Sequence, residues 1–179
     1  MNSLKENSQN AHIVIVGSGI IGKFNALELS ELGFQITIID PTQIQNSSNA
    51  ALGLLMGNMY QKRRGRSWEL RKQSIELWPQ WITFLQKFNY ELNIEKPLIK
   101  LTTNEEKFKK LEKFVYENND QNLRILERDS IFIKNINKAF QATNIKGMIS
   151  FKDGRINPFS LLQTLDTVSY THLRAHETR

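Results

Sequence analysis

A glycine-rich turn between a strand and a helix is the feature that most constrains how this chain folds. Residues 12–16 are an apolar, β-branched run without polar alternation, which is typical of a parallel strand covered on both faces. The pattern Gly-x-Gly-x-x-Gly follows at once and opens a helical segment that Gly33 would end. A second strand, residues 35–39, ends on Asp40. The sequence therefore predicts an α/β fold built on a strand–turn–helix–strand unit with a parallel sheet.

This unit has the arrangement that binds dinucleotides in Rossmann-type folds. Gly17 allows the tight turn, Gly19 lets the backbone approach a diphosphate, and Gly22 lets the helix pack on the strand. The N-terminus of the helix offers free N–H groups and the positive end of its dipole to that diphosphate. Asp40, 18 residues after Gly22, would accept hydrogen bonds from ribose hydroxyls and disfavour a 2′-phosphate. The residues predicted to contact the cofactor in the turn are Gly17, Ser18, Gly19, Ile20, Ile21 and Gly22.

The segment after the second strand bears on which dinucleotide is bound. Residues 41–66 show no period and contain serines, glycines and small aliphatic residues, which is typical of a binding loop. An NAD-binding unit usually continues with another helix and strand, whereas a flavoprotein needs a loop along its ring. The order of segments favours a flavoprotein. The alternatives are a different flavoprotein class or an NAD-dependent dehydrogenase that shares only this fingerprint, and a glycine turn that holds no ligand.

Four stretches together resemble the N-terminal part of FAD-dependent oxidoreductases of the glycine oxidase / D-amino-acid oxidase superfamily. They are residues 12–40, 47–55, 74–85 and 153–158, and the resemblance covers about residues 13–165. It implies FAD as cofactor and oxidation of the CH–NH bond of glycine, D-amino acids or related amines by hydride transfer to flavin. It implies that Asp40, where the family more often has Glu, holds the adenosine ribose. In the loop it implies contacts of Ser47 or Ser48 with the diphosphate, and of Ala51, Leu52, Gly53 and Leu54 with the flavin.

The resemblance also divides the chain into parts. Residues 11–85 would form the FAD-binding Rossmann unit with its flavin loop and a long helix, and residues 86–152 part of an α+β substrate domain. Residues 153–166 would return toward the FAD domain, and residues 167–179, which do not resemble the family, are expected to be a non-native tail on a truncated chain. The arginine and tyrosine that clamp a substrate in the family lie further along, so no catalytic residue is assigned. The fragment itself is expected to be inactive.

Hydrophobic periodicity predicts the remaining helices and strands. Ser67 is expected to cap a long helix in which Pro79 introduces a kink. Its apolar stripe includes Leu70, Leu77, Trp78, Trp81, Ile82 and Leu85, so the tryptophans are interpreted as core residues. Asn104 should open another helix, residues 123–144 should form short helical pieces, and residues 148–151 a strand. Asn157 and Pro158 should open a final helix.

Composition limits the class of protein. The 179 residues are 40% hydrophobic and 23% charged, and they contain no cysteine, which excludes a disulfide scaffold and a thiolate metal site. No segment resembles a signal peptide or a membrane span, and the absence of cysteine fits a reducing compartment. These features favour a soluble, cytoplasmic protein, and the family resemblance implies a small amine or amino acid as its partner. It gives no indication of the oligomeric state.

The net charge of +6 comes almost entirely from one segment. Residues 61–72 carry six basic side chains and one acidic side chain, and the rest of the chain is close to neutral. This distribution argues against a nucleic-acid-binding face, so the segment is interpreted as a solvated loop, or as a site for an anionic substrate if it is functional. His172 and His176 have a helical spacing but no acidic partner nearby, so no metal site is expected.

Overall fold

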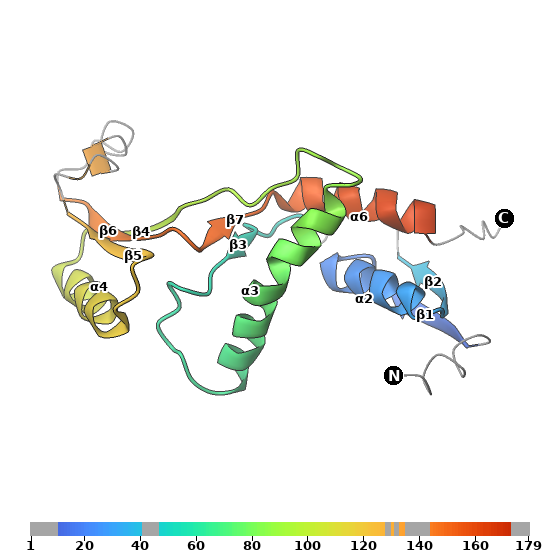
Figure 1. Ribbon diagram of the computed structural model, residues 1–179, viewed down its shortest axis with the longest axis horizontal. Helices are drawn as coiled ribbons and strands as arrows, with labels where there is room; N and C mark the ends of the chain where they lie inside the picture. The colour runs from blue at the N-terminus through green and yellow to red at the C-terminus, as the bar shows by residue number, and fades with distance from the viewer. Residues whose placement is uncertain (1–10, 41–46, 128–129, 131–132, 135–143, 173–179) are drawn as a thin grey trace. The chain divides into compact units, whose positions relative to one another are not determined.

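The computed structural model describes residues 11–40, 47–127, 130, 133–134 and 144–172. The chain divides into two compact units (Figure 1). Unit 1 comprises residues 1–53, 80–93 and 157–179, and unit 2 comprises residues 54–79 and 94–156. Each unit is built from segments that are separated in the sequence, whereas the expected ranges 11–85, 86–152 and 153–166 are continuous. The functional roles expected for those ranges stay predictions.

Unit 1 contains the predicted strand–turn–helix–strand element. Strand β1 (His12–Val16) pairs in parallel with β2 (Gln35–Ile39), with His12 opposite Gln35 and Val16 opposite Ile39. Helix α2 (Ile20–Glu31) connects the two strands, and Gly33 follows it with φ of 91°, a left-handed conformation that favours glycine at a helix end. The parallel pair joined by a helix confirms the predicted α/β fold.

The exposure of β1 differs from the expectation for a strand covered on both faces. Val14 and Val16 are 51% and 80% exposed, whereas Ile13 and Ile15 are half-buried. Ile15 lies toward α2, because a Cβ on Gly22 of that helix would be 3.5 Å from the Ile15 side chain. Since side chains alternate along a strand, Val14 and Val16 lie on the opposite face, which no helix of the described residues covers.

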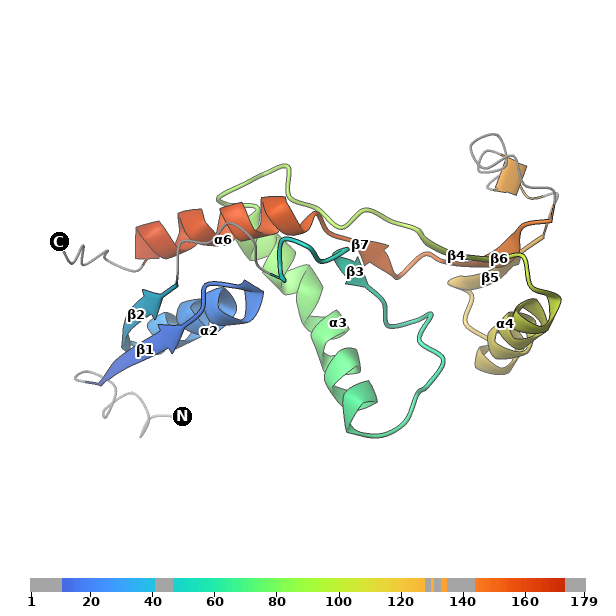
Figure 2. The ribbon, with the colours of Figure 1, turned by 180° about the vertical axis from the view of Figure 1, so that it is seen from behind.

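Two further segments complete the core of unit 1. Helix α6 (Pro158–His172) packs against α2, as Figure 2 shows, and Lys23 of α2 forms an ion pair with Asp166 of α6. Trp81, near the end of α3 (Arg66–Leu85), makes edge-to-face contact with Phe24 of α2 at 4.8 Å between ring centroids. This contact supports the interpretation of Trp81 as a core residue.

Val168 is 1% exposed, so α6 stays packed beyond residue 166. Residues 173–179 lie outside the described part, and their non-native origin stays a prediction.

Unit 2 is built on an antiparallel sheet with one helix packed on it. The strands lie in the order β4 (Leu98–Thr102), β6 (Lys146–Ser150) and β5 (Leu123–Leu126). Helix α4 (Glu105–Asn118) packs against this sheet, and its N-cap Asn104 accepts a hydrogen bond from the Lys107 N–H at 2.9 Å, as predicted. The buried core between helix and sheet consists of Met59, Leu111, Leu123 and Met148.

Three expectations for unit 2 require correction. The first residues of 123–144 form β5 rather than a helical piece, because Leu123 and Leu126 are buried where the strand pairs with β6. Much of the remainder of that range lies outside the described residues. Helix α3 begins at Arg66, so Ser67 is not its cap, and it continues through Pro79. Leu70 and Leu77 of its predicted apolar stripe are 58% and 47% exposed.

A buried carboxylate fixes the segment that follows β3 (Leu54–Leu55). This short strand pairs antiparallel with β7 (Gly154–Arg155). Asp153, 1% exposed, precedes β7 and accepts hydrogen bonds from the N–H groups of Gly57, Asn58 and Met59 at 2.8, 2.8 and 2.6 Å. One side chain therefore satisfies three consecutive backbone donors, of which those of Gly57 and Met59 are buried.

Replacing Asp153 should strongly destabilise unit 2. Asp153→Ala leaves three donors without their acceptor, and we expect it to lower the free energy of unfolding by about 3 kcal/mol. Asp153→Asn keeps one acceptor oxygen and should cost less. Urea unfolding followed by circular dichroism measures both. Glu117→Ala removes an exposed carboxylate paired with Lys113 at 3.7 Å and is the control, with an expected loss below about 0.5 kcal/mol. Equal midpoints for Asp153→Ala and Glu117→Ala would contradict this role.

Candidate functional site

The glycine-rich turn of unit 1 requires glycine at Gly17 and Gly22 and leaves little room for a side chain at Gly19. Gly17 has φ of +103°, a conformation that other residues rarely adopt. A Cβ on Gly22 would lie 2.0 Å from the carbonyl oxygen of Gly17, so the helix can approach the strand only without a side chain there. A Cβ on Gly19 would lie 3.0 Å from Ser48 Oγ. The turn is therefore held tightly against β1 and against the loop that carries Ser48.

The N-terminus of α2 presents backbone donors at this turn. Ser48 Oγ accepts a hydrogen bond from the Ile20 N–H at 3.1 Å and so takes the place of a capping side chain, which Gly19 lacks. Among the described residues, the N–H groups of Ile21 and Gly22 have no hydrogen-bond partner. Since these donors lie at the positive end of the helix dipole, they suit an anionic group such as a diphosphate.

A pocket of about 530 Å³ lies over this helix end. The residues that line it are Ile15, Val16, Gly17, Gly19, Ile20, Ile21, Gly22, Asn25, Ser47, Ser48 and Ala51. Six of the eleven are glycine, serine or alanine, so a ligand can approach the main chain closely. The volume, the glycines and the unpaired N–H groups fit the diphosphate part of a dinucleotide.

Asp40 lies beside the pocket and is tied to the same turn. Its Oδ2 accepts hydrogen bonds from the Ser18 N–H at 2.6 Å and from the Ser18 hydroxyl. The Gly17 N–H also donates to the Ile39 carbonyl at 2.7 Å, so the ends of β1 and β2 are joined. The Ser18 hydroxyl first, and then the Ser18 N–H, hold the pKa of Asp40 below its ordinary value. The side chain is exposed and ionised, as a ribose-binding carboxylate needs to be.

Some of the predicted site residues line the pocket, and others do not. Gly17, Gly19, Ile20, Ile21, Gly22, Ser47, Ser48 and Ala51 line it. Ser18 contacts Asp40 instead, Leu52 is 71% exposed, and Gly53 adopts φ of 68°. Leu54 belongs to β3 in unit 2. Ile15, Val16 and Asn25 also line the pocket and were not predicted from the sequence. Their spacing, at the end of β1 and one turn into α2, could have indicated them.

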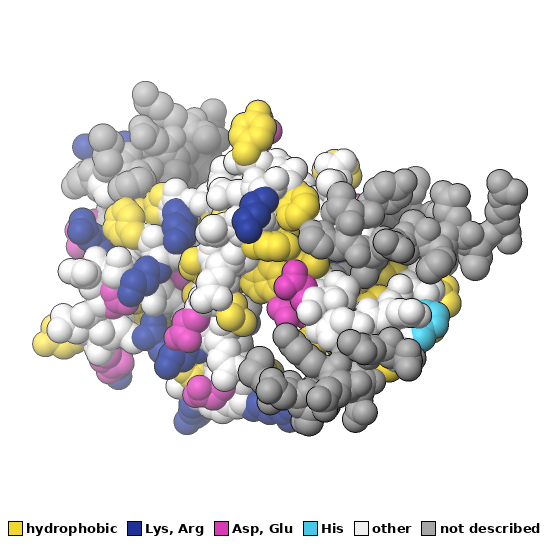
Figure 3. Space-filling model, turned by 45° about the vertical axis from the view of Figure 1, so that its right-hand side comes forward, with side chains coloured by type: hydrophobic (Ala, Val, Ile, Leu, Met, Phe, Trp, Pro, Cys, Tyr) yellow, Lys and Arg dark blue, Asp and Glu magenta, His cyan; other side chains and the backbone are white. Residues whose placement is uncertain are grey.

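The basic segment 61–72 is only partly the solvated loop that was expected. Lys62, Arg64 and Arg66 are exposed. Arg63 donates to the carbonyls of Asn58 and Tyr60 at 2.5 and 3.3 Å, and its guanidinium lies 5.0 Å from the centre of the Phe114 ring. Arg71 donates to the Met56 carbonyl at 3.1 Å and lies 4.2 Å over the ring of Tyr60. These two arginines stabilise the interior of unit 2. Figure 3 shows basic side chains interspersed with acidic ones on the face it presents.

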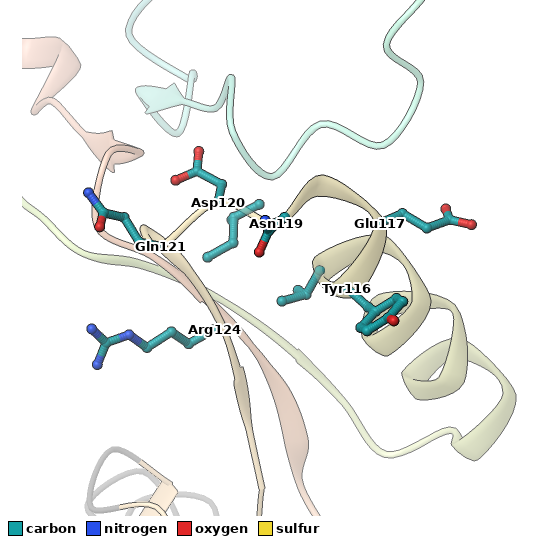
Figure 4. Close-up of a pocket in the computed structure, with 8 residues that line it drawn as sticks. Tyr116, Glu117, Asn119, Asp120, Gln121 and Arg124 are labelled. Carbon is teal, nitrogen blue, oxygen red and sulfur yellow. The ribbon is translucent and has the colours of Figure 1, made fainter.

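A larger hollow in unit 2 lacks the features of a binding site. It measures about 770 Å³ and lies between the end of α4 and the start of β5. Figure 4 shows that Glu117 and Arg124 extend to opposite sides of it, so their charges do not converge on one ligand. Asp120 is engaged by Asn122, whose N–H and side-chain amide hold the pKa of this carboxyl below its ordinary value. The glycine turn therefore remains the candidate site, although its pocket is smaller.

The described residues lack a cluster of metal ligands and a membrane-spanning helix. They contain no group of three His, Cys, Asp or Glu side chains that could hold a metal ion. The side chains of His172 and His176 lie outside the described part. None of the described helices combines the length and apolar character needed to cross a membrane.

Comparisons with known proteins identify what the chain is similar to. A family model described as FAD dependent oxidoreductase matches residues 12–167. The solved structure of glycine oxidase from Bacillus cereus matches with a TM-score of 0.69 and 20% identity over 89% of this chain and 45% of that one. Iminodiacetate oxidase from Chelativorans matches with a TM-score of 0.72 and 17% identity over 89% and 44%. L-Amino acid deaminase from Proteus myxofaciens matches with a TM-score of 0.69 and 17% identity over 92% and 37%.

The chain spans less than half the length of each of the three solved structures, and identities of 17–20% establish a shared fold only. A comparison with curated protein sequences gives no match.

Removing the Ser48 hydroxyl should weaken cofactor binding at the pocket. Its oxygen accepts from the Ile20 N–H, so its proton is free to donate to a diphosphate. We expect Ser48→Ala to raise the Kd for FAD about tenfold, which corresponds to ~1.4 kcal/mol, as measured by quenching of flavin fluorescence. The control is Ser30→Ala, which removes a hydroxyl bonded to the Leu27 carbonyl at the other end of α2. An unchanged Kd for Ser48→Ala would refute a role for this hydroxyl.

Proposed function

The chain belongs to the family of FAD-dependent oxidoreductases, and on this premise we propose that it is part of an enzyme that oxidises the C–N bond of an amino acid or related amine. The cofactor of this family is FAD. When bound, FAD supplies an acceptor for the hydride that leaves the substrate carbon. The observation that carries the proposal is the pocket over the α2 N-terminus, where three glycines, two unpaired N–H groups and Ser48 meet.

The residues of unit 1 have defined roles in this proposal. The N–H groups of Ile21 and Gly22, with the Ser48 hydroxyl, bind the diphosphate, and Ser47 and Ala51 close the side of the pocket. Asp40 accepts hydrogen bonds from the adenosine ribose, and its negative charge repels a 2′-phosphate. Leu52, Gly53 and Leu54 continue the chain along the flavin. Leu52 is 71% exposed, which supports this part of the proposal, since an exposed apolar side chain can contact a ring.

The substrate class rests on the named activities of the structural neighbours. They are a glycine oxidase, an iminodiacetate oxidase and an L-amino acid deaminase, whose names all refer to small amino compounds. We therefore propose a small amine or amino acid as substrate, without choosing among glycine, D-amino acids and other amines. Unit 2 is proposed to be part of a substrate domain. The family match argues against the alternative of an NAD-dependent dehydrogenase.

Binding of FAD by the 179-residue chain tests the proposed cofactor site. Gly19→Val adds a side chain whose first carbon would already lie 3.0 Å from Ser48 Oγ, so the pocket is filled and the loop displaced. We expect the Kd for FAD to rise by more than about tenfold, measured by flavin fluorescence quenching. The control is Ala50→Val, which adds similar bulk at an exposed position of the same loop that does not line the pocket. If Gly19→Val and Ala50→Val bind FAD equally well, the pocket is not the cofactor site.

Turnover by the FAD-loaded chain is a separate question. The chain spans less than half of each solved neighbour. We therefore propose that the 179 residues bind FAD without completing a substrate site. Anaerobic addition of glycine, sarcosine or D-alanine should leave the visible absorbance of the bound flavin unchanged. Bleaching by any of them would show that these 179 residues suffice for catalysis and would identify the substrate.

A further inference from the structure

Ser18 makes two hydrogen bonds to one oxygen of the carboxylate that ends β2. Its N–H and its hydroxyl both donate to Asp40 Oδ2, although the two residues are 22 positions apart in the sequence. Within the described residues, Asp40 Oδ1 receives no hydrogen bond. The carboxylate is therefore held by one oxygen and presents the other to solvent beside the pocket.

This arrangement orients a side chain that burial does not restrain. Asp40 is exposed, so without Ser18 its carboxylate would be free to rotate and would lose conformational entropy on binding a ligand. The two bonds remove that freedom before the ligand arrives, which increases affinity without adding a contact to the ligand. Ser18 itself does not line the pocket.

We propose that Ser18 is a positioning residue, which fixes Asp40 so that its free oxygen accepts a hydrogen bond from the adenosine ribose of the cofactor. The inference rests on the proposed function, since it assigns a role within the same FAD site. It adds a determinant of affinity for the ribose hydroxyls that acts through Asp40 and not through contact with FAD.

The electrostatic surroundings of Asp40 agree with this role. Hydrogen bonds from Ser18 favour the charged carboxylate, and Lys23 of α2 adds a weaker effect of the same sign, so the pKa of Asp40 is lowered. His12, the other titratable side chain of the β1–β2 pair, lies at the opposite end of the strands and is bonded to Thr37. Removal of the Ser18 hydroxyl should therefore let the pKa of Asp40 rise toward its ordinary value.

The experiment compares two cofactors and several variants of the 179-residue chain. The probes are FAD and an FAD analogue that carries 2′,3′-dideoxyadenosine. We expect Ser18→Ala to raise the Kd for FAD about fivefold, the size of one net hydrogen bond, and to leave the Kd for the dideoxy analogue unchanged. Ser18→Thr keeps the hydroxyl and should bind FAD like the unmodified chain. Ser74→Ala, which removes an exposed hydroxyl in α3, is the control.

The pH dependence of the Kd for FAD is a second measurement, and it would not change if Ser18 only supported the fold of the turn. Because the pKa of Asp40 is lowered, binding of FAD by the unmodified chain should persist as the pH falls and weaken only when the pH passes below the ordinary pKa of an aspartate. In Ser18→Ala this loss should begin at a higher pH. Asp40→Asn, which still accepts from Ser18 but carries no charge, should lose this pH dependence and bind FAD more weakly.

The outcomes separate this inference from the proposed function. In one outcome the unmodified chain binds FAD, and Ser18→Ala has the same Kd for both cofactors and the same pH profile as the unmodified chain. This result overturns the positioning role of Ser18 and leaves the proposed FAD site intact. If Ser18→Ala weakens both cofactors equally, Ser18 supports only the fold of the turn and the inference fails. If Ser18→Ala does not fold, an effect of Asp40→Asn on FAD but not on the dideoxy analogue supports the inference, and equal effects overturn it. If the unmodified chain does not bind FAD, both proposals fail.

Discussion

The close approach of α2 to β1 at Gly22 is the contact on which the site depends. A side chain there would place its first carbon 2.0 Å from the Gly17 carbonyl, so only glycine allows the first turn of the helix to lie against the end of the strand. The same turn needs the left-handed conformation of Gly17. Because of this contact, the N–H groups at the start of α2 and the end of β1 border one pocket.

Asp40 and Asp153 both accept hydrogen bonds from backbone N–H groups, but they differ in burial. Asp40 accepts donors from Ser18, and Asp153 accepts the N–H groups of residues 57–59. Asp153 is 1% exposed, so all of its hydrogen-bonding capacity serves the fold of unit 2. Asp40 is exposed, so one oxygen is available to a ligand. Burial, and not residue type, separates the structural carboxylate from the proposed cofactor-binding one.

The proposed cofactor pocket is formed by residues of unit 1. The diphosphate and the ribose that we propose it binds are parts of every FAD molecule. Structural neighbours that share 17–20% identity are named for different amino compounds. In unit 2, Arg63 and Arg71 are engaged by backbone carbonyls and aromatic rings. They are therefore poor candidates for a substrate carboxylate.

The sequence by itself determined β1, α2 and β2, the left-handed residue at Gly33 and the cap at Asn104, because each depends on local sterics or on a hydrogen bond within a few residues. The glycine spacing also indicated five residues of the pocket lining, because it fixes where a helix can begin, and the family resemblance indicated Ser47, Ser48 and Ala51. Only the tertiary structure decided that residues 123–126 form a strand, because that choice depends on pairing with β6. Likewise, it decided that Val14 and Val16 are exposed and that Ser18 holds Asp40. Such features depend on which distant segments meet, and a local pattern carries no information about that pairing.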